Sequence, residues 1–91
     1  MSYRIDMSKE AHDTIARFQK SNIKAFRKVM ALIKDITEHP RTGIGHPEPL
    51  KKGDDRTYSR RISKKDRLIY DIHDEIITVL IISAEGHYSD K

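Results

Sequence analysis

A nearly unbroken run of β-branched residues close to the end of the chain limits the folds open to it. Residues 76–82 read Ile-Ile-Thr-Val-Leu-Ile-Ile. Such a run is typical of a central strand that is covered on both faces. With 91 residues, the chain can build one modest core, so we expect a single domain over residues 1–91. The preceding residues must therefore supply the strands and helices around this strand.

Two helices are predicted before the sheet is completed. Residues 3–7 alternate between apolar and polar, which indicates a short strand, and Ser8 is a good N-cap for a helix over the following residues. A second helix is expected to begin after Ser21-Asn22 and to end near Pro40. Its expected apolar stripe consists of Ile23, Phe26, Met30, Ile33 and Ile36.

Three strands are predicted in the second half of the chain. Residues 57–62 and 67–72 read as strands on either side of a turn at 63–66, and a second turn at 73–75 leads into residues 76–82. The order β-α-α-β-β-β predicts an α+β fold, with a helical hairpin packed on one face of a small antiparallel sheet. Depending on the strand register, we expect the core of the sheet to draw on Ile62, Leu68, Ile69, Tyr70, Ile72, Val79 and Ile81.

The positive charge is concentrated in one segment. Residues 51–67 hold eight Lys or Arg and three acids, a net charge of +5, whereas the remainder of the chain carries −1. This is the footprint expected of a polyanion partner, although a solvated charged hairpin is the alternative. The chain has no cysteine and no apolar run of about 20 residues. We therefore expect a cytoplasmic protein with no disulfide and no membrane association.

Glu48 is the first candidate for chemistry. It lies between Pro47 and Pro49, just before the basic segment, and the prolines restrict the backbone on both sides of it. A carboxylate near several cations stays ionised, which suits a general base that takes a proton from a ribose 2′-hydroxyl. A loop glutamate that only offsets positive charge is the structural alternative.

Arginines and aromatic residues could complete a site around Glu48. Arg60, Arg61 and Arg67 could grip phosphate oxygens, and Arg61 and Arg67 share a sheet face if three or five residues connect them, but not if four do. Tyr58 could stack on an unpaired base or be a half-buried strand residue. His87 could act as a general acid, with Tyr88 beside it. The other histidines show no zinc-binding spacing and are read as structural or solvent-exposed: His12, His39, His46 and His73.

Four segments of the sequence resemble one toxin family. Residues 43–51, read as Gly-Ile-Gly-His-Pro-Glu-Pro-Leu-Lys, are similar to the G-x-G-x-P-E-P-L-K motif of YoeB/Txe toxins, a branch of the RelE/ParE superfamily. Residues 58–62 resemble the W-S-R-R-I strand of that family, with Tyr58 in place of its tryptophan. Residues 67–70 resemble its H-R-L-[VI]-Y strand, and His87-Tyr88 its terminal H-Y pair. These segments occur in the family's order and spacing.

The resemblance implies a type II toxin–antitoxin toxin with a microbial-RNase-like fold. Such a toxin cleaves messenger RNA on the ribosome without a metal or another cofactor, through attack of the 2′-oxygen on the phosphate. It implies that Glu48 is the base, Arg67 the transition-state clamp and His87 the acid, with Tyr88 assisting. Lys51 and Arg61 would position the RNA. The expected partners are a cognate antitoxin, the decoding site of the small ribosomal subunit and mRNA, and a homodimer stays open.

Two other functions stay open from the sequence. One is a non-catalytic toxin of the same superfamily that binds a different target, as the gyrase-poisoning branch does, because a shared fold does not imply shared chemistry. The other is a plain RNA-binding module that uses residues 51–67. The set of Glu48, Arg67 and His87 distinguishes the nuclease from both alternatives.

Overall fold

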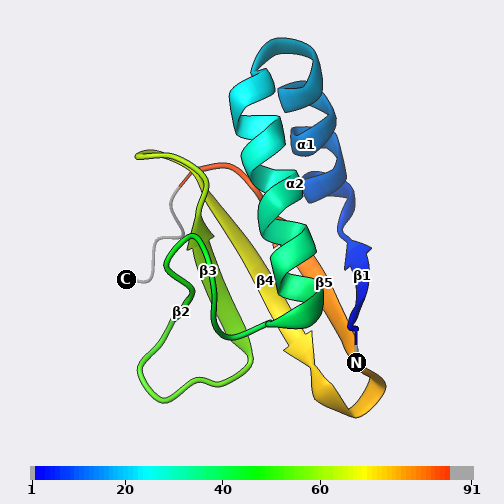
Figure 1. The fold of residues 1–91 in the computed structure, drawn as a ribbon, viewed down its shortest axis with the longest axis vertical. Helices are drawn as coiled ribbons and strands as arrows, with labels where there is room; N and C mark the ends of the chain where they lie inside the picture. The colour runs from blue at the N-terminus through cyan, green and yellow to red at the C-terminus, as the bar shows by residue number, and fades with distance from the viewer. Residues whose placement is uncertain (1, 87–91) are drawn as a thin grey trace.

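A computed structural model describes residues 2–86 of the chain. The predicted order of elements is confirmed, with one additional short strand (Figure 1). The elements are β1 (Arg4–Met7), α1 (Lys9–Ser21), α2 (Ile23–Glu38), β2 (Glu48–Pro49), β3 (Thr57–Arg61), β4 (Arg67–His73), a 3₁₀ turn η1 (Asp74–Ile76) and β5 (Thr78–Ser83). Together they form the expected α+β fold.

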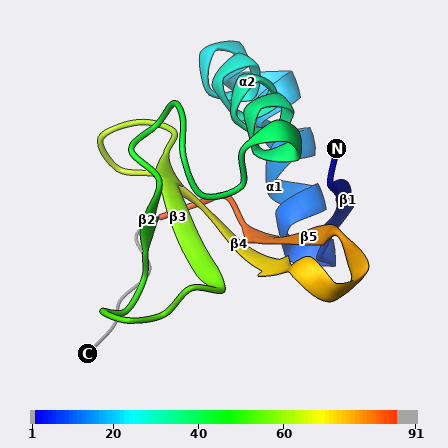
Figure 2. The ribbon, with the colours of Figure 1, turned by 60° about the horizontal axis from the view of Figure 1, so that its bottom comes forward.

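The five strands form one mixed sheet in the order β1-β5-β4-β3-β2. Strands β3, β4 and β5 make the predicted antiparallel meander. The sheet is not wholly antiparallel, however, because β1 lies parallel to β5 and pairs Ile5 with Val79. The alternation over residues 3–7 indicates a strand but carries no information about its partner. Figure 2 shows the two helices together on one side of the sheet.

The helix ends form where the sequence places them. The Ser8 hydroxyl caps α1 by accepting a hydrogen bond from the Ala11 amide at 3.0 Å, and the Asn22 side chain caps α2 in the same way. The second helix ends at Glu38, two residues before Pro40. Within residues 2–86, neither helix is long and apolar enough to cross a membrane.

The buried face of α2 is offset from the predicted stripe. Ile23 and Met30 are 50% and 37% exposed, so this part of the prediction is wrong. Apolar residues cover two adjacent faces of α2, and helical spacing alone does not say which face meets the sheet. The buried face of α2 consists of Ala25, Val29, Leu32 and Ile36.

The run over residues 76–82 forms an interior strand only from Thr78 onward. Ile76 lies in η1 and is 66% exposed, and Ile77 adopts a left-handed backbone at φ 49°. The expected burial of both faces of this strand is also wrong, because Leu80 and Ile82 are only half-buried. The predicted sheet residues are all buried: Ile62, Leu68, Ile69, Tyr70, Ile72, Val79 and Ile81.

Candidate active site

The fully buried side chain of Arg60 holds the loop that carries Glu48. Its guanidinium extends from β3 into the space between the sheet, the end of α2 and residues 39–46. It donates to five acceptors, which are the Tyr70 hydroxyl, the Asp35 carboxylate and the carbonyls of His39, Thr42 and Ile44. The predicted role of Arg60 in RNA binding is therefore wrong, because its side chain has no exposed surface. It supports the site structurally.

Asp35 and Gly45 form hydrogen bonds that hold the same loop from two sides. The Asp35 carboxylate accepts from Arg60 at 2.6 Å and from the Ile44 amide at 3.2 Å. The hydrogen bond from Arg60 lowers the pKa of Asp35, so the carboxylate stays ionised. The Gly45 carbonyl accepts from the Arg61 amide at 2.7 Å. The loop is thus fixed to α2 and to the end of β3, directly before Glu48.

Glu48 lies on β2, the edge strand of the sheet, where it pairs with Ser59. Its side chain is 61% exposed, and Oε1 is 3.5 Å from Nη1 of Arg67 on β4. Glu48 and Arg67 belong to strands that flank β3, so the sheet itself brings them together. The structure thus places two of the candidate site residues, Glu48 and Arg67, in contact.

The connection between β3 and β4 settles the register that the sequence left open. Arg61 pairs with Arg67, so five residues connect the two strands. Within this connection, the Ile62 amide donates a hydrogen bond to the Asp66 carbonyl. Directly paired residues of an antiparallel ladder have their side chains on the same face. Arg61 and Arg67 therefore share the face opposite Arg60.

Gly86, the last described residue, is hydrogen-bonded to Arg67 and Asp66. The Arg67 amide donates to the Gly86 carbonyl at 3.1 Å, and the Gly86 amide donates to the Asp66 carboxylate at 2.8 Å. His87 and Tyr88 lie outside the described residues, so their predicted roles stay predictions.

Tyr58 occupies the core instead of an RNA-facing surface. It is 8% exposed, its ring stacks on that of Tyr70 at a centroid distance of 6.3 Å, and its hydroxyl donates to Asp55. The predicted stacking platform is therefore wrong, and Tyr58 is more deeply buried than the alternative of a half-buried strand residue expected. Lys51 is exposed two residues beyond Pro49.

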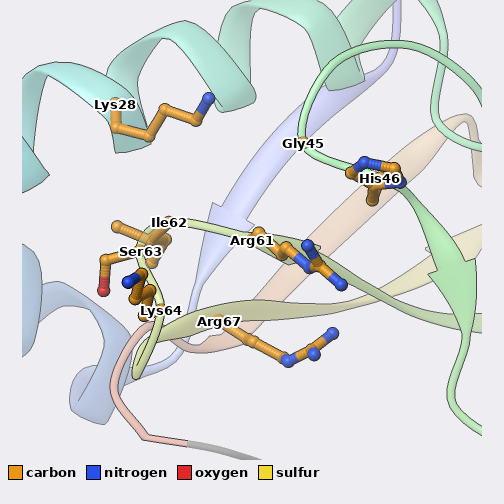
Figure 3. A pocket seen from close by; sticks show the side chains of 8 residues that line it. All are labelled: Lys28, Gly45, His46, Arg61, Ile62, Ser63, Lys64 and Arg67. Atoms are coloured by element: carbon orange, nitrogen blue, oxygen red, sulfur yellow. The ribbon is translucent and has the colours of Figure 1, made fainter.

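A cavity of about 530 Å³ lies beside the Glu48–Arg67 pair, and we call it the basic cavity (Figure 3). It is lined by Lys28, Gly45, His46, Arg61, Ile62, Ser63, Lys64 and Arg67. Of these lining residues from the described part of the chain, four are Lys or Arg and none is acidic. Figure 3 shows the guanidinium groups of Arg61 and Arg67 extending in the same direction from adjacent strands.

Two residues of the basic cavity are not identified by their sequence pattern. His46 is solvent-exposed, as expected, but it also lines the cavity and has a left-handed backbone at φ 54°. That conformation is uncommon outside glycine, and its place beside Pro47-Glu48 is the only signal in the sequence. Lys28 reaches the cavity from α2, and no local motif marks it.

The arrangement suits chemistry on a phosphodiester. Arg61 and Arg67 can bind two phosphate oxygens and stabilise the negative charge that develops on phosphorus. Glu48, held at the rim by its ion pair, can accept a proton from a nucleophile presented to that phosphate. Strand pairing fixes the backbone positions of all three residues, so their side chains extend from adjacent points of the sheet.

Comparison with known families and proteins covers most of the chain. Residues 7–88 match the family described as YoeB-like toxin of bacterial type II toxin-antitoxin system. The chain is 44% identical to the toxin YoeB of a Synechocystis species over 78% of this chain and 80% of the relative. It is 36% identical to the toxin YoeB of Escherichia coli K12 over 89% of this chain and 94% of the relative.

Solved structures give the same result. The YoeB dimer from Staphylococcus aureus superposes with a TM-score of 0.83 at 34% identity, covering 97% of this chain and 100% of that one. The YoeB-YefM complex from the same organism gives a TM-score of 0.79 at 35% identity, with the same coverage. The chain therefore belongs to the YoeB-like toxins of bacterial type II toxin–antitoxin systems.

Proposed function

We propose that this toxin is a ribosome-dependent endoribonuclease that cleaves messenger RNA and so stops translation. The observation that carries the proposal is the Glu48–Arg67 ion pair at the rim of the basic cavity. A carboxylate beside four Lys or Arg side chains provides a proton acceptor next to a phosphate-binding surface. Ribosomes and messages are in the cytoplasm, so we place the activity there.

The proposed step is an internal transesterification. Glu48 removes the proton from a ribose 2′-hydroxyl, and the 2′-oxygen attacks the adjacent phosphorus. The bond to the 5′-oxygen breaks, which leaves a 2′,3′-cyclic phosphate on one fragment, and the 5′-oxygen takes a proton from His87. Arg67 binds the equatorial oxygens of the phosphorane, and Tyr88 assists at the same phosphate. These roles need no metal.

The neighbouring cations hold the substrate. Arg61 lies opposite Arg67 and can bind the same phosphate or the next one. Lys51 is exposed just beyond Glu48 and can contact the strand outside the cavity. We further propose that a cognate antitoxin binds and silences this toxin, and that two copies can pair. The YoeB-YefM complex and the YoeB dimer of the S. aureus relative support both proposals.

A message with one altered ribose tests the mechanism. Purified toxin and ribosomes are incubated with a message that carries a 2′-O-methyl group at the mapped cleavage position. We expect the unmodified message to be cut to a 2′,3′-cyclic phosphate and the modified message to stay intact there. Cleavage of both messages at the same position, or no ribosome-dependent cleavage of either, would contradict the proposal.

A further inference from the structure

A second cavity of about 630 Å³ adjoins the basic cavity, between α2 and the turn that joins β3 to β4. The two cavities share Lys28, Ile62 and Ser63 in their linings. We call the second one the helix–turn groove, and it is lined by Asn22, Lys24, Ala25, Arg27, Lys28, Ile62, Ser63, Lys65 and Asp66. We propose that it is a binding subsite for the sugar-phosphate backbone of the RNA strand that runs on from the cleaved phosphate.

Positive charge lines the groove from two directions. Lys24, Arg27 and Lys28 come from one face of α2, and Lys65 comes from the turn on the other side. Among residues 2–86, the single acid of the lining is Asp66, which is 5% exposed and accepts a hydrogen bond from the Gly86 amide. That carboxylate is engaged within the turn, so the open surface of the groove is cationic.

Several cations on the rest of the surface have acidic partners. Lys9 pairs with Asp13, Arg17 with Glu85, and Arg41 with both Asp55 and Asp74. By contrast, no ion pair with an acid is found among residues 2–86 for these groove residues: Lys24, Arg27, Lys28 and Lys65. Unpaired cations gathered in one concave surface are what a polyanion requires.

The basic residues at the start of α2 lower the stability of the helix. The first turn of α2 contains Lys24 and no acid, and the helix has no acid at all before Asp35. A basic side chain near a helix N-terminus interacts unfavourably with the macrodipole, and an acid there would be favoured. A residue type that disfavours the local structure indicates that the function requires it at that position.

Continuity with the basic cavity favours an RNA strand over an acidic peptide. Because the cavities share lining residues, one strand bound at Arg61 and Arg67 can pass directly into the groove. Among residues 2–86, the lining holds no aromatic residue on which a base could stack, so the contacts from these residues are to phosphates. The groove should therefore add affinity without adding base preference. This inference rests on the proposed function.

The test compares two double variants that remove the same charge. Lys24→Gln with Lys65→Gln alters the groove, whereas Lys20→Gln with Lys34→Gln alters exposed helix positions outside both cavity linings. Binding of 2′-O-methyl RNAs of three and nine nucleotides is measured by fluorescence anisotropy over a range of salt concentrations. These RNAs cannot be cleaved, so a failure of the nuclease proposal does not affect the readout. Thermal unfolding confirms that each variant is folded.

We expect the groove variant to bind the nine-nucleotide RNA about 25-fold more weakly at 0.1 M salt. This follows from the loss of two phosphate contacts, each with a salt slope of about 0.7 for single strands. The three-nucleotide RNA should lose far less, and the control variant should match the wild-type protein. Equal affinities of the two double variants for the longer RNA would overturn the proposal.

Two further binding measurements identify other occupants of the helix–turn groove. If the groove variant loses affinity only for ribosomes without a message, ribosomal RNA is the occupant and the proposal fails. If it loses affinity for a poly-glutamate peptide but not for RNA, the groove binds an acidic protein segment and the proposal also fails.

Discussion

Arg61 and Arg67 lie directly opposite each other on β3 and β4, with both side chains on the sheet face opposite Arg60. Like charges at directly paired positions destabilise a sheet by about 0.2–1 kcal/mol. Glu48 offsets part of this repulsion through its contact with Arg67. An exposed arginine that weakens the sheet and lines the basic cavity is best explained by a ligand with negative charge.

Replacing Arg61 should therefore separate stability from RNA binding. We expect Arg61→Gln to leave the free energy of unfolding unchanged or to raise it by up to about 1 kcal/mol, because a repulsive pair is removed. The variant should bind RNA about fivefold more weakly at 0.1 M salt, for one lost phosphate contact. Urea denaturation and RNA binding measure the two effects. Lower stability with unchanged binding would show that Arg61 is structural.

Replacing Glu48 should remove activity and leave the fold intact. We expect Glu48→Gln to slow cleavage of ribosome-bound message by about 10²- to 10⁴-fold, because the amide cannot accept the proton. The free energy of unfolding should change by less than about 1 kcal/mol, since the side chain is mostly exposed. Glu75→Gln, at an exposed position in η1, is the matched control. Equal rates for the two variants would exclude Glu48 as the base.

Much of the fold follows from the sequence because its local signals agree. The N-caps at Ser8 and Asn22, the helix end before Pro40 and the meander of three strands are all present. The parallel pairing of β1 with β5 could not be predicted, since it joins opposite ends of the chain. The offset of α2 arose because apolar residues at helical spacing cover more than one of its faces.

The candidate site was predictable in part. Glu48 and Arg67 come together because hydrogen-bonded strands carry both. Arg60 and Arg61 are adjacent in sequence, and only the alternation of side chains along β3 separates a core residue from a cavity residue. The buried Tyr58 and Ile62 flank Arg60 at a period of two, so this pattern contains the missed signal. Lys28 reaches the cavity through packing, which no local motif encodes.

Arg60 should be among the most important residues for stability. We expect Arg60→Met to lower the free energy of unfolding by about 3–5 kcal/mol, because the Asp35 carboxylate and the loop carbonyls lose their donor. Arg60→Lys should be intermediate, since an ammonium cannot reach all five acceptors. Thermal and urea unfolding test this order. A variant as stable as Arg61→Gln would contradict the structural role.

A low pH should reduce the free energy of unfolding, partly through protonation of Asp35. The hydrogen bond from Arg60 places the folded-state pKa of Asp35 below its unfolded value of about 3.9. The resulting stability is complete above the unfolded pKa and is lost as the pH falls through the folded pKa. Asp35→Asn should therefore be less stable than wild type near pH 6, and the difference should shrink below pH 4. Urea unfolding at a series of pH values measures it, and a difference that stays constant would refute the coupling.

A side chain at Gly45 should destabilise the protein for two physical reasons. A comparison with Gly53 separates the two effects. Gly45 and Gly53 both have left-handed backbones, at φ 80° and 85°, so alanine at either position costs about 1–2 kcal/mol. A Cβ on Gly45 would also lie 2.6 Å from a Leu32 methyl carbon, whereas one on Gly53 would meet nothing within 4 Å. We expect Gly45→Ala to cost about 1–3 kcal/mol more than Gly53→Ala, because it overpacks the core. It should also slow cleavage, since the Gly45 carbonyl bonds to the Arg61 amide at the edge of the basic cavity. Equal unfolding free energies and equal cleavage rates for the two variants would show that the loop can shift without disturbing the site.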